Sequence, residues 1–221
     1  MKKITSLPQQ LNKMKIVCLS DLHGHLPEVP ECDLLLLGGD YCPRANSQEK
    51  WFVKKMTPWI NELSKTRKII GVAGNHDFLF EAGPDFRPQM EWTYLQDSGC
   101  EWGGLKFWGT PWQPAYYDWA FNANEWELMQ IWKQIPDDTD ILLLHGPPRG
   151  FGDLSPFGNV HTGSPSLLER IKEIKPKLVI AGHIHSGYGR YQIEETIFLN
   201  CSLVDEAYKP VNSIQIVELA S

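Results

Sequence analysis

The sequence predicts a mixed α/β protein in which helices cover layered β-sheets. Three observations lead to this prediction: several apolar runs share one strand-like pattern, helical patterns lie between them, and glycine-containing turns join further alternating segments. Strands that alternate with helices indicate parallel pairing, and the added hairpins indicate antiparallel strands.

The apolar runs share a polar start, four to six apolar residues and a glycine or other small turn that carries polar residues. Continuous apolar runs of this length are typical of strands that are covered on both faces. The runs lie at residues 15–25, 33–40, 68–77, 140–148 and 177–185.

Helical patterns between these runs occupy residues 47–65, 123–135 and 165–175. The first has an apolar stripe, although Pro58 should kink it. Asn122 and Glu125 have the spacing of a capping box for the second helix. Ser164 followed by Pro165 is a typical start for the third.

Antiparallel strands are predicted in the remaining alternating segments. A Gly-Gly turn divides residues 101–108 into a hairpin, and a short turn separates 188–193 from 196–201. Residues 213–219 also alternate between apolar and polar side chains. Together with the strand–helix units, these segments predict a layered α/β sandwich.

Length and charge limit the classes of function. The 221 residues, 1–221, are predicted to form a single domain, with residues 1–13 as an N-terminal extension. A net charge of −6 disfavours stable nucleic-acid binding. The sequence has no secretory signal and no run near the ~18 apolar residues that span a bilayer. The five scattered cysteines are typical of a reducing compartment, so we expect a cytoplasmic protein. Because no apolar run is long enough to span a bilayer, we expect no membrane binding.

Side chains of metal-binding types follow all five predicted strands. Because the carboxyl ends of strands form the ligand crevice in layered α/β proteins, we expect these side chains to converge. Each residue alone is more often an ordinary cap or turn residue, but five such loops seldom converge by chance. The set contains Asp21, His23, Asp40, Asn75, His76, His145, His183 and His185. Carboxylate, amide and imidazole ligands without thiolate fit manganese, iron, cobalt, nickel or zinc, and their number fits two ions that share a carboxylate.

In their order, these motifs resemble the signature of the calcineurin-like metallophosphoesterases, over essentially the whole chain after residue 13. The motifs are DLH at 21–23, GGD at 38–40, GNHD at 74–77, HG at 145–146 and GHIH at 182–185. More narrowly, three segments resemble the fetal-brain-239-like metallophosphoesterase-domain branch and its bacterial relatives, and they lie at 108–121, 145–153 and 182–191. The resemblance implies a four-layer α/β/β/α sandwich.

The resemblance also implies a role for each motif residue. One metal ion would be held by Asp21, His23 and His185, the other by Asn75, His145 and His183, with Asp40 as the bridge. We expect two divalent ions, with manganese first and iron, zinc, cobalt or nickel as alternatives. A metal-bridging hydroxide would attack phosphorus, and His76 would protonate the leaving group. Asp77 would either orient His76 or cap the next helix.

Two positions differ from the patterns of related phosphoesterases and narrow the class of enzyme. Pro43 stands where protein serine/threonine phosphatases carry a second aspartate, which argues against that substrate class. His183 is retained where some animal members of the nearer branch have glycine, so a full dinuclear site is expected. Further candidates for substrate contact, each of which could equally be a solvated loop residue, are His25, Arg44, Arg149 and His161.

The sequence therefore favours a metal-dependent phosphodiesterase that acts on small or cyclic-nucleotide diesters. A phosphomonoesterase and a nuclease with the same core are the enzymatic alternatives, and the acidic charge disfavours the nuclease. An alternative outside the enzymes is a protein-interaction scaffold without catalytic activity. A retromer subunit with this fold is an example, and it lacks the general-acid histidine. The expected partner is a small phosphate ester, with a homodimer as a further option.

Overall fold

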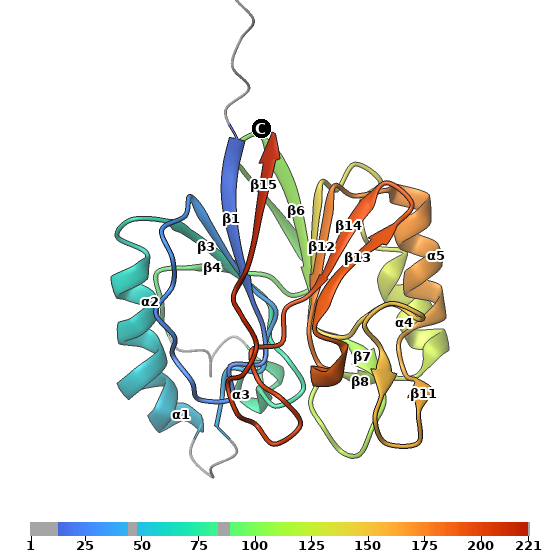
Figure 1. The fold of residues 1–221 in the computed structure, drawn as a ribbon, viewed down its shortest axis with the longest axis horizontal. Coiled ribbons are helices and arrows are strands. Elements are labelled where there is room, and N and C mark those ends of the chain that lie inside the picture. The colour runs from blue at the N-terminus through green and yellow to red at the C-terminus, as the bar shows by residue number, and fades with distance from the viewer. Residues whose placement is uncertain (1–12, 44–47, 84–88, 221) are drawn as a thin grey trace, which may run out of the picture.

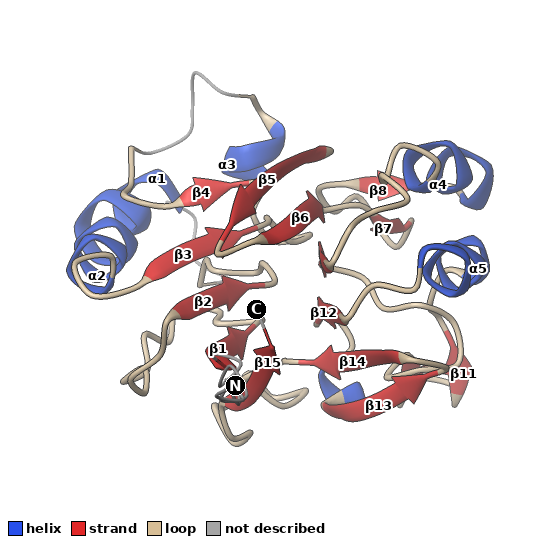
Figure 2. Ribbon diagram, turned by 90° about the horizontal axis from the view of Figure 1, so that it is seen from above, coloured by secondary structure: helices blue, strands red, loops and turns tan. Residues whose placement is uncertain are grey.

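The computed structural model describes residues 13–43, 48–83 and 89–220. Two β-sheets lie face to face, and helices cover the outer face of each sheet (Figures 1 and 2). The four-layer α/β/β/α arrangement expected from the sequence is confirmed.

The first sheet has five strands in the order β15-β1-β2-β3-β4. Neighbours from β1 to β4 are parallel, and β15 pairs antiparallel with β1 at the edge. The strands are β1 (Lys13–Leu19), β2 (Leu34–Leu37), β3 (Lys68–Gly71), β4 (Thr93–Tyr94) and β15 (Gln215–Ala220). Because β1 begins at Lys13, which pairs with Ala220, this residue belongs to the sheet and not to the expected extension.

The second sheet has six strands in the order β13-β14-β12-β9-β6-β5, with antiparallel pairs at both edges. Its strands are β5 (Ser98–Trp102), β6 (Leu105–Thr110), β9 (Ile141–Leu144), β12 (Leu178–Ala181), β13 (Gly189–Ile193) and β14 (Thr196–Asn200). The predicted Gly-Gly hairpin joins β5 to β6, where positive φ at Gly103 (58°) and Gly104 (77°) matches the twist of the strands. Two short strand pairs flank this sheet, β7 (Gln113–Pro114) with β8 (Asn122–Ala123) and β10 (Leu154–Ser155) with β11 (Val160–His161).

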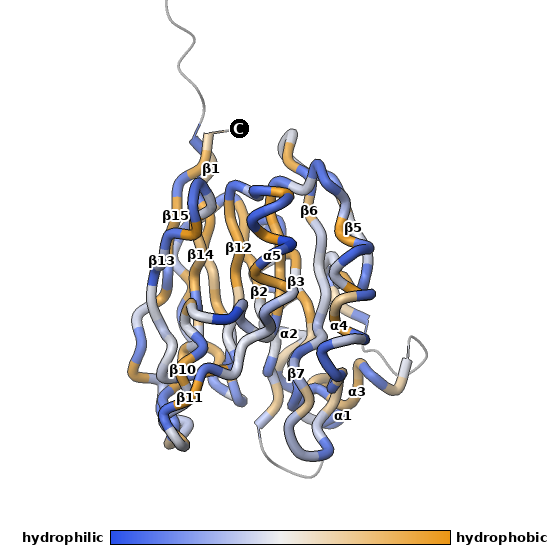
Figure 3. The backbone as a smooth tube through the Cα atoms, turned by 90° about the vertical axis from the view of Figure 1, so that its right-hand side faces the viewer, coloured by the Kyte–Doolittle hydropathy of each residue, from blue (hydrophilic) through white to orange (hydrophobic). Residues whose placement is uncertain are grey.

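Alternation along the strands divides the core into three apolar layers. On β2, Leu34 and Leu36 face the other sheet, whereas Leu35 and Leu37 face the helices. All four side chains are buried, as predicted for strands covered on both faces. Figure 3 shows the resulting concentration of hydrophobic segments along strands such as β12 and β14.

The helices of the first outer layer follow β2 and β3. Thr57 donates its backbone N–H to the Phe52 carbonyl, so Pro58 is preceded by a π-helical turn and does interrupt the regular α-helix. The helical elements are α1 (Gln48–Trp51), the π-helical turn (Phe52–Met56), α2 (Thr57–Leu63) and α3 (Phe78–Glu81). Among the described residues, no helix combines the length and the apolar character that a membrane-crossing segment needs.

Two helices cover the second sheet, α4 (Glu125–Trp132) and α5 (Pro165–Ile174). The predicted start of α5 is confirmed, because the Ser164 side chain accepts the Leu167 N–H at 3.2 Å. The predicted cap of α4 is wrong. Asn124, not Asn122, caps this helix, in a capping box with Glu127.

Candidate metal centre

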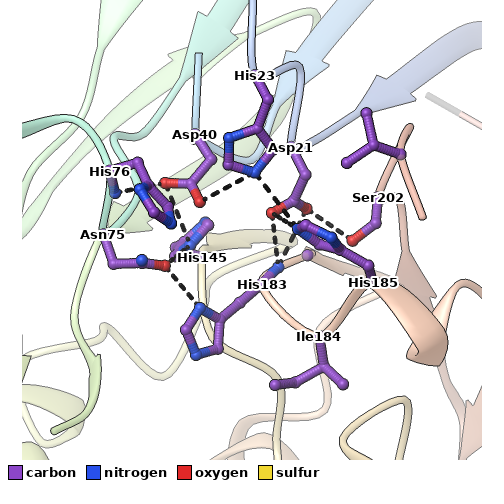
Figure 4. A network of polar contacts seen from close by, with 12 residues as sticks. Asp21, His23, Asp40, Asn75, His76, His145, His183, Ile184, His185 and Ser202 are labelled. Atoms are coloured by element: carbon purple, nitrogen blue, oxygen red, sulfur yellow. Dashed lines mark hydrogen bonds and ion pairs between the residues drawn. The ribbon is translucent and has the colours of Figure 1, made fainter. Parts of the chain in front are cut away.

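Five strands of the two sheets end at one site, and the seven predicted metal ligands meet there (Figure 4). They come from the loops after β1, β2, β3, β9 and β12. The loops are held together by backbone hydrogen bonds, for example Asp21 N–H to Gly39 O (2.9 Å) and Gly182 N–H to His145 O (2.9 Å). The convergence inferred from the sequence is therefore present in the fold.

Asp21, His23 and His185 form a first ligand set. Their ligand atoms lie within 4.8 Å of one another. The Nε2 atoms of His23 and His185 are 3.3 Å apart, and His185 Nε2 lies 3.4 Å from Asp21 Oδ1. These are the three residues expected to hold one ion.

Asn75, His145 and His183 form a second ligand set. Asn75 Oδ1 lies 2.7 Å from His145 Nε2 and 2.6 Å from His183 Nδ1. Asp40 lies between the two sets, with Oδ2 3.6 Å from His23 Nε2 and Oδ1 3.6 Å from His145 Nε2. One carboxylate thus faces both sets, as a bridging ligand must.

The chain adopts costly backbone conformations to bring these side chains together. Asp21, His23, Asp40 and His183 have φ values of 53°, 41°, 55° and 66°, in the left-handed region that disfavours residues with a Cβ. Glycine is needed beside them: a Cβ on Gly182 would lie 2.0 Å from Asp21 Oδ2. Such strain persists only where the surrounding structure holds it, and it gathers at functional sites.

Hydrogen bonds to groups outside the ligand sets orient the side chains of several ligands. His145 Nδ1 donates to the Gly38 carbonyl at 2.8 Å, and His185 Nδ1 donates to the Asp205 carbonyl at 3.0 Å. In its neutral form, each ring therefore turns the lone pair of Nε2 into the site. The Ser202 hydroxyl donates to Asp21 Oδ2 at 2.7 Å and orients this carboxylate.

Burial keeps most of the imidazoles neutral. It lowers the pKa of His23 to about 3, and it lowers the pKa values of His145 and His183 as well. For His185, burial lowers the pKa, but the hydrogen bond and the charge of Asp21 outweigh this effect and the net pKa is raised.

The two ligand carboxyls have opposite pKa shifts. Burial raises the pKa of Asp40 well above its ordinary value, and the negative charges of Asp77 and Asp21 raise it further. Burial also acts to raise the pKa of Asp21, but the hydrogen bond and the charge of His185 reverse the effect and lower it.

The residues present fit a pair of divalent cations. In the second set, an amide oxygen faces the acceptor nitrogen of His145 at 2.7 Å, which is unfavourable unless both atoms bind the same cation. His23 Nδ1 and Asn75 Nδ2 are buried without a hydrogen-bond partner among the described residues. Oxygen and imidazole donors without thiolate suit divalent transition metals.

His76 lies at the edge of the site and is partly buried, as is His183, whereas the other six ligands are buried. Its backbone N–H donates to Asp40 Oδ1 at 2.7 Å, and its ring centroid lies 5.1 Å from that of His23. The imidazole is therefore next to a ligand of the first set, while the contact with the bridging Asp40 is made by the main chain. This geometry suits a proton donor that is separate from the metal ligands.

Asp77 holds two ligand loops together. One of its oxygens accepts from Tyr41 N (3.0 Å) and Cys42 N (3.3 Å), and the other accepts from Gly74 N (2.9 Å). Although Asp77 occupies the cap position of α3, its side chain makes no capping hydrogen bond there. The orienting role expected for it beside His76 stays a prediction.

The candidates for substrate contact have different surroundings. His25 Nε2 is 3.0 Å from the Tyr208 carbonyl oxygen, so this imidazole braces a neighbouring loop. His161 Nδ1 is paired with the buried Asp153 at 2.7 Å, and Arg149 donates to the His161 carbonyl at 3.1 Å. Arg44 lies outside the described residues. Contact of these four residues with substrate stays a prediction.

Sequence reasoning missed several residues of the site. Tyr208 packs its ring against His23, with centroids 4.6 Å apart, and Trp119 packs against His76 at 4.8 Å. Asn200 is fully buried, and its Nδ2 contacts the carbonyls of Gly152 and Ile184 at 3.1 and 2.9 Å. Trp119 lies in a segment that the family resemblance singled out, but no local signal marks Tyr208 or Asn200.

Comparisons with known proteins point to one family. A family model described as calcineurin-like phosphoesterase matches residues 14–187. Human metallophosphoesterase domain-containing protein 1 is 32% identical, over 96% of this chain and 73% of that protein. A UPF0046 protein of Caenorhabditis elegans is also 32% identical, over 90% of this chain and 80% of that protein.

A solved structure supports the fold independently. The phosphopantetheinyl hydrolase of Mycobacterium tuberculosis superposes with a TM-score of 0.61 at 14% identity, covering 93% of this chain and 96% of that one. The layered fold, the ligand cluster and the sequence matches together define a metal-dependent phosphoesterase. The chain belongs to the calcineurin-like phosphoesterase family.

Proposed function

We propose that this phosphoesterase is a phosphodiesterase with two divalent ions, and that it hydrolyses small diesters, including cyclic nucleotides. The observation that carries the proposal is the position of Asp40, whose two oxygens face separate ligand sets at 3.6 Å each. Two adjoining ion sites with a shared carboxylate suit the in-line displacement of a phosphate ester.

The ions would polarise the phosphoryl group and lower the pKa of a water that attacks it. Asp21 and Asp40 bring only two negative charges to a set whose other ligands are neutral, so the site keeps a positive balance for an anionic ester. His76 would donate a proton from its ring to the leaving oxygen. The backbone contact between His76 and Asp40 keeps this donor beside the bridging ligand.

Manganese is the ion that we propose first, with iron, zinc, cobalt and nickel as alternatives. The oxygen and imidazole ligands accept any of these ions, since geometry and metal availability decide among them. We also propose a cytoplasmic location. All five cysteines are free thiols in the part of the chain that the structure describes, which suits a reducing compartment.

The experiment is a metal-reconstitution assay. Purified protein is stripped with a chelator, reloaded with manganese, and assayed with bis(4-nitrophenyl) phosphate, 4-nitrophenyl phosphate, a cyclic nucleotide and a single-stranded oligonucleotide. We expect manganese-dependent hydrolysis of the diester and the cyclic nucleotide above the monoester.

Each other outcome has a definite meaning. If the monoester is the better substrate, the protein is a phosphomonoesterase. If the oligonucleotide is the better substrate, the protein is a nuclease. Absence of hydrolysis, with no metal bound on reloading, would favour an interaction scaffold.

A further inference from the structure

Three aromatic side chains form a contiguous surface in the loop between β7 and β8. The ring centroids of Tyr116 and Tyr117 are 4.3 Å apart, and those of Trp119 lie 5.3 and 5.8 Å from the two tyrosines. Tyr116 is 50% exposed and Tyr117 is 74% exposed. We call these three residues the aromatic platform. Contiguous apolar surface that is exposed to solvent is typical of binding sites.

The platform borders the metal centre. Trp119 packs on the His76 ring with centroids 4.8 Å apart, and it is perpendicular to the His183 ring, with centroids 6.3 Å apart. The loop that carries the platform lies at the same end of the molecule as the loop that leads into β15 (Figure 1). A ligand on the platform would therefore lie beside the group that we assign as the proton donor.

The platform is held in place before any ligand arrives. Asn122 Nδ2 donates to the Tyr117 carbonyl at 2.7 Å and so supports the left-handed conformation of Tyr117, whose φ is 51°. Ala120 N–H donates to the Asn75 carbonyl at 3.1 Å, which ties the loop to a metal-ligand loop. A surface that is already ordered loses little conformational entropy on binding.

The chemistry of the loop indicates a flat, uncharged ring as the occupant. Residues 111–124 contain no lysine or arginine, so they offer no cation for a second phosphate. The faces and edges of tyrosine and tryptophan rings favour stacked or edge-on contact with another π-system. Stacking of a base on aromatic side chains contributes about 1–3 kcal/mol per base.

We propose that Tyr116, Tyr117 and Trp119 bind an aromatic ring in the leaving group of the substrate, so that the enzyme selects phosphate esters of aryl or nucleoside groups. The assignment to the leaving-group side follows from the contact between Trp119 and His76. It rests on the proposed function, in which His76 protonates the leaving oxygen.

The test measures binding of two matched phosphonates by calorimetry. In benzylphosphonate a CH₂ group replaces the ester oxygen and carries a flat ring, whereas cyclohexylmethylphosphonate carries a saturated ring of similar size. For the manganese-loaded protein we expect the flat ring to bind about 2- to 10-fold more tightly, as an aromatic contact gives beyond the area that both rings bury.

Substitutions at the two exposed tyrosines test the platform itself. A Tyr116→Leu/Tyr117→Leu double variant should lose most of this preference, and the matched Tyr116→Phe/Tyr117→Phe variant should keep it. Leucine retains a Cβ, so it adds no new backbone strain at residue 117. Trp126→Leu removes a ring that is 68% exposed on α4 and should leave the preference unchanged.

Equal affinities in the wild type, binding of neither phosphonate, or an unchanged preference in the Leu double variant would overturn the inference. Each single Leu variant repeats the test if the double variant does not fold. Failure of the proposed function would look different: the protein would bind no manganese on reloading, or it would bind the phosphonates and hydrolyse no ester.

Discussion

Substitution of His76 by alanine separates proton donation from metal binding. The link between His76 and Asp40 is a backbone N–H bond of 2.7 Å, which the substitution leaves in place. The seven ligand side chains are also unchanged, so we expect both ions to stay bound. What is lost is the imidazole beside the His23 and Trp119 rings.

The size of the effect should depend on the leaving group. A positioned general acid contributes about 10²–10⁴-fold, which corresponds to about 3–5 kcal/mol of barrier. An alkoxide leaving from a nucleotide or sugar diester needs this proton, so we expect the full loss there. Nitrophenolate is a far weaker base and leaves readily without it, so we expect little loss with bis(4-nitrophenyl) phosphate.

The assay compares kcat/KM of wild type and His76→Ala for both esters, alongside metal analysis of each protein. A His76→Gln variant controls for the volume lost against Trp119 and should behave like the alanine variant. Equal losses on both esters, or a fall in metal content, would refute the reasoning. His76 would then be a ligand or a positioning residue, and the proton would come from another group.

The remaining predictions concern the ligands and their support. Asp40→Asn should reduce bound metal to one ion or fewer per chain and abolish hydrolysis, as metal analysis and the ester assay will show. The raised pKa values of Asp40 and His185 mean that metal must displace protons. Metal affinity should therefore rise with pH, about tenfold per pH unit for each proton released, as calorimetry in two buffers will show. A pH-independent affinity would contradict this. Asn200→Ala leaves buried carbonyls unpaired and should lower the free energy of unfolding by about 1–3 kcal/mol. Metal binding by the GHIH loop should also weaken. Unchanged denaturation curves would exclude this role of Asn200. Chelation should lower the melting temperature, and manganese should restore it, because bound metal stabilises the native state by mass action. Circular dichroism should show that the secondary structure survives chelation.

The ligands could be predicted from the sequence because each lies a few residues after an apolar run. The apolar run predicts a buried parallel strand, and the carboxyl ends of such strands lie at the ligand crevice. The type of residue that follows the strand then indicates the chemistry of the site. His145 is the simplest case, since it directly follows β9. No long-range information was needed to place it at the site.

The cap of α4 shows where local patterns fail. Asn122 with Glu125 and Asn124 with Glu127 have the same spacing, so the sequence alone does not decide between them. Tertiary contacts decide. Asn122 supports the platform loop through the Tyr117 carbonyl, and Glu125 accepts hydrogen bonds from the Ser166 backbone and side chain. Only the second pair is left to cap the helix.

Tyr208 and Asn200 were missed for a related reason. Tyr208 reaches His23 and His185 from the loop before β15, far along the chain from both. Asn200 joins the loops after β9 and β12 by side-chain contacts with their carbonyls. A tyrosine or an asparagine in such positions has no distinctive spacing, so its role appears only when the two sheets are packed together.

The backbone conformation of the ligand loops is set by the fold and not by the ions. Left-handed conformations at Asp21, His23, Asp40 and His183 cost of order 1–3 kcal/mol each, and side-chain ligation alone does not set main-chain angles. Main-chain hydrogen bonds hold them, such as His23 N–H to Asp40 O at 2.9 Å. The sheet packing therefore imposes the strain, and the ions bind to a cradle that the fold has already shaped. This is why substitutions of a ligand should remove metal first and leave the fold in place.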